Sequence, residues 1–134
     1  MTASKVLLIF LISIFSQGII CGQNQLDTIS AEKAAQLIGQ EVIIKAKIVS
    51  VYYSQNSKGK PTFLNLERKY PNNPVAIVIF EQAIEKLKIN TDLYLNKTVI
   101  VSGKMEAYKD KTPPYKLKPI ITIYKKDQIK ILEN

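Results

Sequence analysis

Alternating hydrophobic and polar residues form the dominant pattern of this chain. The alternation is longest over 41–53, where the residues on one side are Val42, Ile44, Ala46 and Ile48. A period of two residues predicts a β-strand. Because sheet twist accumulates along a strand, one this long cannot stay flat in a small domain, and we expect it to curve into the wall of a barrel.

A later stretch repeats this design. Residues 38–48 align with residues 95–105, and each copy has a very small residue at mid-strand, Ala46 in the first and Gly103 in the second. Small residues permit the close backbone approach or sharp bend that a barrel requires. Each copy leads into a loop rich in lysine and turn-forming residues and then into a further strand. We therefore expect two coiled hairpins that together form a small closed barrel.

Two helices are expected beside the strands. A short N-terminal helix is predicted over 30–39, where a capping serine begins it and a glycine ends it. Its buried stripe would consist of Ala34, Leu37 and Ile38, and the helix would cover one opening or edge of the sheet. Residues 81–88 have helical spacing, with charges opposite an apolar stripe, and this spacing predicts a second helix.

The complete order of predicted elements indicates one fold. Further strands are predicted over 61–66, 115–123 and 75–80, the last of which is apolar on both faces and therefore suits a central position. Three strands, a helix and two more strands are the arrangement of the oligonucleotide/oligosaccharide-binding (OB) fold. We therefore expect a mainly β protein, a five-stranded OB-fold Greek-key barrel with a short N-terminal helix and a helix between strands 3 and 4.

The N-terminal region has the pattern of a secretory signal peptide. A short polar start with one lysine precedes an apolar run over 6–15, which is about half of the roughly 20 residues that span a bilayer. We expect residues 1–22 to be the signal peptide and 23–134 to be a single OB-fold domain in the periplasm or outside the cell. A retained membrane anchor and lipid attachment at Cys21 are the alternatives.

Several short motifs resemble the OB-fold nucleic-acid-binding domains of small exported bacterial proteins. Similar domains accompany secreted thermonuclease-type enzymes. The motifs are KGKPTFLNL at 58–66, YPN at 70–72, VIF at 78–80, NKTVIVSG at 96–103 and YK at 108–109. The resemblance extends over roughly 30–131 but departs at Ala46, where the family pattern more often has glycine, and no nuclease portion is present in this sequence. It implies a fold and a binding class, and it does not imply catalysis.

The composition of the chain restricts its chemistry. The 134 residues carry a formal net charge of +8, which favours anionic partners. There is no histidine, Cys21 is the single cysteine, and none of the common hydrolase, zinc or nucleotide motifs is present. The acidic residues are scattered among lysines without metal-ligand spacing. We therefore expect no catalytic residues, no cofactor and no metal site.

Binding residues are expected on the face of strands two and three and on the two flanking loops, because this is the ligand surface of OB folds. Single-stranded nucleic acid needs cations that follow phosphates and aromatic rings on which bases stack. The expected nucleic-acid-binding residues are Lys58, Lys60, Phe63, Asn65, Arg68, Tyr70, Lys109, Lys111, Tyr115 and Lys116. Tyr52 and Tyr53 lie on opposite faces of their strand and cannot both line one groove. Tyrosines that close the barrel and solvated lysines are the alternative interpretation.

The main hypothesis is a non-catalytic exported OB-fold module that binds single-stranded or accessible nucleic acid. Sequence-specific recognition is not indicated, because the chain has no tryptophan, one arginine and no recognition-helix motif. One alternative is an envelope OB-fold protein that binds a protein or a saccharide, and another is an accessory subunit of a separate nuclease, since a fold alone does not set function. The oligomeric state stays open.

Overall fold

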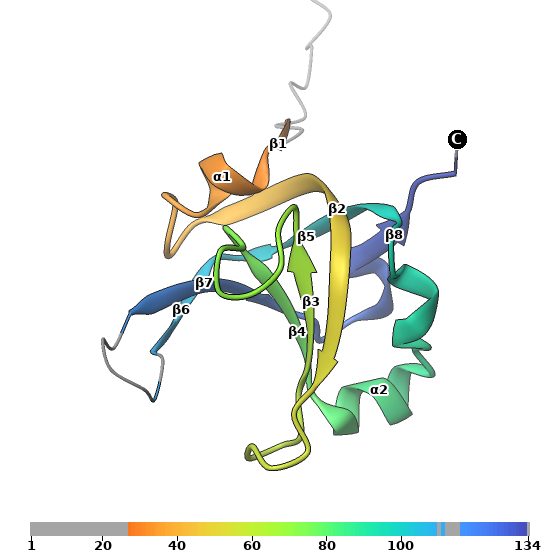
Figure 1. The fold of residues 1–134 in the computed structure, drawn as a ribbon. Helices are drawn as coiled ribbons and strands as arrows, with labels where there is room; N and C mark the ends of the chain where they lie inside the picture. The colour runs from red at the N-terminus through yellow and green to blue at the C-terminus, as the bar shows by residue number, and fades with distance from the viewer. Residues whose placement is uncertain (1–26, 110, 112–115, 134) are drawn as a thin grey trace, which may run out of the picture.

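The structure, a computed structural model, describes residues 27–109, 111 and 116–133. Its helices are α1 (Ala31–Ala34), α2 (Glu81–Leu87) and the 3₁₀ turns η1 (Thr91–Tyr94) and η2 (Lys126–Gln128). Its strands are β1 (Thr28–Ile29), β2 (Glu41–Tyr53), β3 (Thr62–Leu66), β4 (Ala76–Ile79), β5 (Thr98–Lys104), β6 (Glu106–Lys109), β7 (Leu117–Thr122) and β8 (Ile129–Ile131). Figure 1 shows these strands curled around a common centre.

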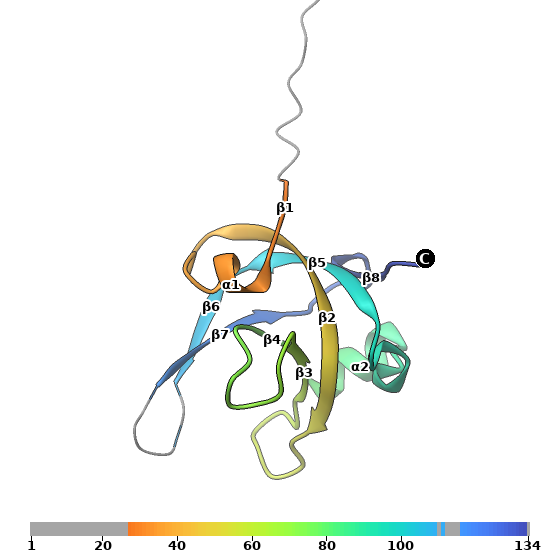
Figure 2. The ribbon, with the colours of Figure 1, turned by 45° about the horizontal axis from the view of Figure 1, so that its top comes forward.

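The strand order confirms the predicted OB-type barrel. The sheet runs β6-β7-β4-β3-β2-β5-β8, and β1 is added beside β2. Strands β5 and β6 are consecutive in the chain and are separated only by Met105, so the sheet curls back on itself, as the view in Figure 2 also shows. The β4–β7 pair is parallel, whereas β2–β3, β3–β4, β6–β7 and β2–β5 are antiparallel. The fourth strand of the predicted barrel is therefore divided into β5 and β6.

The long first strand of the barrel, β2, changes partner and face along its length. Its first half pairs with β5 and its second half pairs with β3. Between Ile48 and Ser50 the register with β3 shifts by one residue, which is a β-bulge. Before the bulge the even-numbered residues are buried, whereas beyond it Val51 packs against the core and Tyr52 is 61% exposed. The bulge therefore turns Ser50 and Tyr52 to the outer face.

The hydrophobic core fills the barrel interior. Its largest fully buried side chains include Ile44, Ile48, Leu64, Ile77 and Val101. Every residue of β4 is buried, which confirms its predicted central position between β3 and β7. The small residue expected at mid-strand in β5 is also explained, because a Cβ on Gly103 would lie 2.8 Å from Cγ2 of Ile121.

The N-terminal helix is much shorter than the predicted range 30–39. Ser30 is its cap, as expected, and its Oγ accepts a hydrogen bond from the Lys33 N–H at 3.2 Å. The helix ends at Ala34 because the chain then turns toward the barrel, where the Gly39 N–H donates to the carbonyl oxygen of Met105 at 2.7 Å. Ile38, expected in the buried stripe, is 45% exposed. Figure 1 shows α1 and α2 at opposite ends of the barrel, so α1 does cover one opening.

Other boundaries differ from the predictions by a few residues. The fourth strand was expected to begin at residue 95, but η1 ends only at Tyr94 and the strand begins at Thr98. The signal-peptide range 1–22, with Cys21, lies outside the described residues. None of the helices in the described part of the chain has the length and apolar character that a bilayer crossing requires.

Candidate functional site

A groove with a volume of about 560 Å³ lies on the outer face of the barrel wall. It extends over the second half of β2 and over β3, β4, β6 and β7, and it includes the loop 67–74 between β3 and β4 and the start of the loop 54–61 between β2 and β3. This is the face on which sequence patterns predicted ligand binding, because it carries the outward side chains of the second and third barrel strands. Strand register determines which side chains meet there.

Three aromatic rings form one wall of the groove. Tyr52 of β2 is the register partner of Phe63 of β3, and their rings stack with centroids 6.5 Å apart and an interplanar angle of 26°. The Phe63 ring meets Tyr108 of β6 edge-on at 6.4 Å. Phe63 also packs on a small apolar cluster of Ala76, Val78 and Ile120. Because Tyr52 is 61% and Tyr108 37% exposed, both rings leave apolar surface in contact with solvent.

A chain of polar side chains crosses the groove beside these rings. Asn65, which is 4% exposed, donates from Nδ2 to Oγ of Ser50 at 2.9 Å. The Oδ1 of Asn65 accepts from Nδ2 of Asn73 at 3.2 Å. The Oδ1 of Asn73 is buried and has no hydrogen-bond partner among the described residues. Burying an amide costs free energy unless hydrogen bonds compensate for the lost water, so the bonds to Ser50 and Asn73 fix the position of Asn65 in the groove floor.

Two lysines supply the positive charge of the groove lining. Lys69 comes from the loop 67–74 and Lys118 comes from β7, where it lies opposite Tyr108 in the β6–β7 ladder. The Nζ of Lys118 lies 5.2 Å from the ring centroid of Tyr70 and donates to the carbonyl oxygen of Pro71 at 3.0 Å. No carboxylate is among the described side chains that line the groove. The groove is therefore aromatic, amide-rich and cationic.

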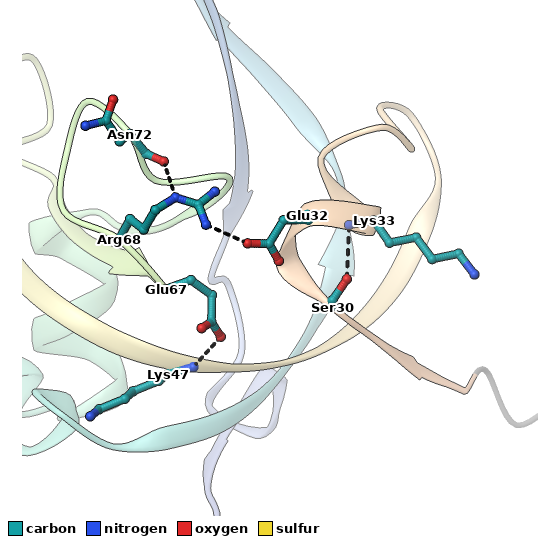
Figure 3. Close-up of polar contacts among 7 residues, drawn as sticks. All are labelled: Ser30, Glu32, Lys33, Lys47, Glu67, Arg68 and Asn72. Carbon is teal, nitrogen blue, oxygen red and sulfur yellow. Dashed lines mark hydrogen bonds and ion pairs between the residues drawn. The ribbon is translucent and has the colours of Figure 1, made fainter.

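Arg68 holds the loop that forms one side of the groove. Its Nε donates to the carbonyl oxygen of Asn72 at 2.9 Å, and its Nη1 donates to Oε1 of Glu32 in α1 at 2.9 Å, as Figure 3 shows. The pKa of Glu32 is lowered, mainly by a hydrogen bond between its carboxylate and its own backbone and to a smaller extent by the hydrogen bond from Arg68. Glu67 fixes the start of the loop, because its N–H donates to the Lys47 carbonyl oxygen and its Oε1 accepts from the Lys47 N–H.

The loop 54–61 between β2 and β3 folds toward α2. The Nζ of Lys60 lies 3.7 Å from Oε2 of Glu81, the first residue of α2. The hydroxyl of Tyr53 donates to the other oxygen of Glu81 at 3.1 Å. The pKa of Tyr53 is raised, mainly by loss of solvent around the phenol and to a smaller extent by this hydrogen bond. A Cβ on Gly59 would lie 2.7 Å from the Phe80 ring, so the loop packs closely on that residue.

Of the ten residues expected to bind, the structure places Phe63, Asn65 and Tyr70 in the groove lining. Arg68 and Lys60 are engaged by Glu32 and Glu81 and lie outside the lining. The other expected residues are Lys58, exposed in the loop 54–61; Lys109, Lys111 and Lys116, exposed at the β6–β7 hairpin; and Tyr115, which lies outside the described residues.

The groove also contains residues that sequence patterns did not single out. The polar ones are Ser50, Ser54, Ser57, Lys69, Asn73 and Lys118. The alternation of lysines in 116–118 was a signal for Lys118, but its pairing with Tyr108 depends on the register of the hairpin. Tyr52 could be placed on this face only by knowing of the bulge before it.

No family model and no curated protein matches this sequence. Solved structures do resemble it. Aspartyl tRNA synthetase from Entamoeba histolytica is 16% identical with a TM-score of 0.54, and the match covers 86% of this chain and 23% of that one. Asparaginyl-tRNA synthetase from Entamoeba histolytica is 21% identical with a TM-score of 0.50, and the match covers 82% of this chain and 24% of that one.

This chain therefore spans about a quarter of the length of the solved structures it resembles. At such low identity the likeness establishes a common fold. Together with the strand order and the helix α2 between β4 and β5, it defines the protein as an OB-fold protein.

Proposed function

We propose that this protein is a non-catalytic OB-fold module that binds single-stranded or otherwise accessible nucleic acid in the groove. The observation that carries the proposal is the wall of Tyr52, Phe63 and Tyr108, beside which the described groove lining has two lysines and no carboxylate. Aromatic rings stack on bases of any sequence, and each stacked base contributes about 1–3 kcal/mol by alanine substitution. Lysines beside such a wall are placed to neutralise phosphates.

The two structural neighbours support the nucleic-acid-binding part of this proposal. Both are named as aminoacyl-tRNA synthetases, enzymes that act on an RNA, and the matched part is only about a quarter of each enzyme. A small domain of a nucleic-acid enzyme is consistent with a binding role that leaves the chemistry to other parts of the protein. Within the described residues there is no cluster of three or more side chains that could hold a metal ion.

Substitution of an exposed aromatic residue tests the proposal. We expect Tyr52→Ala to weaken binding of a fluorescein-labelled single-stranded oligonucleotide about five- to 150-fold, which corresponds to the loss of one stacked base. The matched control is Tyr124→Ala, because Tyr124 is 66% exposed, similar to the 61% of Tyr52, but lies outside the groove. Fluorescence anisotropy of the full chain measures both affinities. Equal effects of the two substitutions, or no binding by the wild type at low salt, would contradict the proposal.

We also propose that the protein is exported after removal of residues 1–22. The support is an apolar run over 6–15 that follows a lysine and is too short to span a bilayer. Cell fractionation and intact mass of the isolated protein test this. A mass that begins at Gln23 supports cleavage, a lipid adduct on Cys21 supports the lipoprotein alternative, and a full-length cytoplasmic protein overturns export.

A further inference from the structure

The loop 67–74 carries three of the groove residues, Lys69, Tyr70 and Asn73. It contains no helix or strand, and the Tyr70 side chain is 58% exposed. A loop with little burial of its own has low local stability. The position of Tyr70 and Lys69 in the groove therefore depends on contacts that the loop makes with other elements.

Glu67 and Lys118 attach the loop to the barrel wall. The N–H and Oε1 of Glu67 both bond to the backbone of Lys47, at 2.8 and 3.0 Å. Lys118 bonds to the carbonyl oxygen of Pro71 from the groove side. These contacts hold the first residue and the middle of the loop, and the hydrogen bond from Asn73 to Asn65 holds its end. The side chain of Arg68, just after Glu67, adds a further partner.

That partner is helix α1, through the planar guanidinium of Arg68. The Nε of Arg68 donates to the carbonyl oxygen of Asn72 within the same loop, and its Nη1 donates to the carboxylate of Glu32 in α1. Figure 3 shows the guanidinium between the loop and α1. Helix α1 is a firm support, because Ala31 and Ala34 are buried in the core on its opposite side. A fixed fork of donors is the geometry in which arginine joins two acceptors at once.

We propose that Glu32 is a positioning residue of the binding groove, and that through Arg68 it holds Lys69 and Tyr70 in place although it does not line the groove itself. This inference rests on the proposed function for its effect on affinity. The positioning itself is a property of the free protein and can be measured without any ligand.

A single tryptophan reports on the loop without nucleic acid. The chain has no tryptophan, so Tyr70→Trp creates one fluorophore in the loop. We expect Glu32→Gln in this background to increase acrylamide quenching of that fluorophore, because the loop is less firmly held. Glu85→Gln is the matched control, since Glu85 is an exposed carboxylate on a helix without an ion pair among the described residues.

A double-substitution cycle tests whether Glu32 acts through Arg68. We expect Arg68→Gln to increase quenching at least as much as Glu32→Gln, and the two substitutions together to have no larger effect than Arg68→Gln alone. Thermal unfolding of each variant is measured in parallel. Additive effects on quenching, or changes that follow only a loss of thermal stability, would overturn the positioning role.

Affinity is then measured in the chain that retains Tyr70. We expect Glu32→Gln to weaken oligonucleotide binding about two- to five-fold, the range of a half-exposed ion pair, and Glu85→Gln to leave it unchanged. If the wild type binds no nucleic acid while Glu32→Gln still increases quenching, the proposed function fails and the positioning stands. Unchanged quenching and unchanged affinity in Glu32→Gln would overturn the inference.

Discussion

The salt dependence of binding follows from which cations the groove contains. Lys69 and Lys118 line it, whereas Lys60 is held by Glu81 at 3.7 Å. Each phosphate contact on a single strand contributes about 0.7 to the slope of log affinity against log salt. With two contacts we expect a slope of about −1.4, so that raising the salt from about 50 to about 200 mM weakens binding about seven-fold.

The lysines of the β6–β7 hairpin provide the competing expectation. If Lys109, Lys111 and Lys116 also contact phosphates, five contacts give a slope of about −3.5 and a loss of more than about 100-fold over the same salt range. Anisotropy titrations at four salt concentrations separate the two values. We expect Lys69→Gln to reduce the slope by about 0.7 and Lys58→Gln to leave it unchanged. A slope near −3.5 that Lys69→Gln does not alter would refute the assignment of phosphate contacts to the groove.

Two further outcomes concern the fold and the loop. Gly103→Ala should destabilise the protein by about 1–3 kcal/mol in urea unfolding, because the added Cβ would lie 2.8 Å from Ile121, and unchanged stability would show that β5 can shift. The pKa of Glu32 is lowered in the folded protein, so its contact with Arg68 is complete above the ordinary glutamate pKa of about 4.3 and is lost as the pH falls through the lowered value. Acrylamide quenching in the Tyr70→Trp variant should therefore rise as the pH falls through the lowered pKa of Glu32, and Glu32→Gln should remove that pH dependence.

The barrel could be predicted from local patterns because its wall strands show either alternation or a short run of apolar residues. The alternation over 41–53 located β2, and the run that is apolar on both faces located the central strand β4. The length of α1 could not be predicted in this way. The stripe expected at Leu37 and Ile38 is typical of a helix, but the hydrogen bond from Gly39 to Met105 joins residues 66 positions apart and redirects the chain.

The groove could be predicted only in part, because its composition depends on register. Phe63 and Asn65 follow from alternation in β3 alone. Tyr52 joins them only because one extra residue lies between Ile48 and Ser50, and no residue type in that stretch marks the bulge. Lys118 enters the groove because the hairpin pairs it with Tyr108. Local sequence determines which residues share a face of one strand, whereas tertiary pairing determines which faces meet.

Tertiary contacts also determine which loop cations remain available to a ligand. A net charge of +8 and lysines in both flanking loops favoured phosphate contacts there. Glu81, however, engages Lys60 of the loop 54–61 and turns it toward α2, and Glu32 likewise engages Arg68 of the loop 67–74 and turns it toward α1. The aromatic wall has no such competitor, because rings that stack on one another still present a free face. Binding by this groove should therefore depend more on Tyr52 than on any loop lysine, and its affinity should persist in salt that would release a purely electrostatic complex.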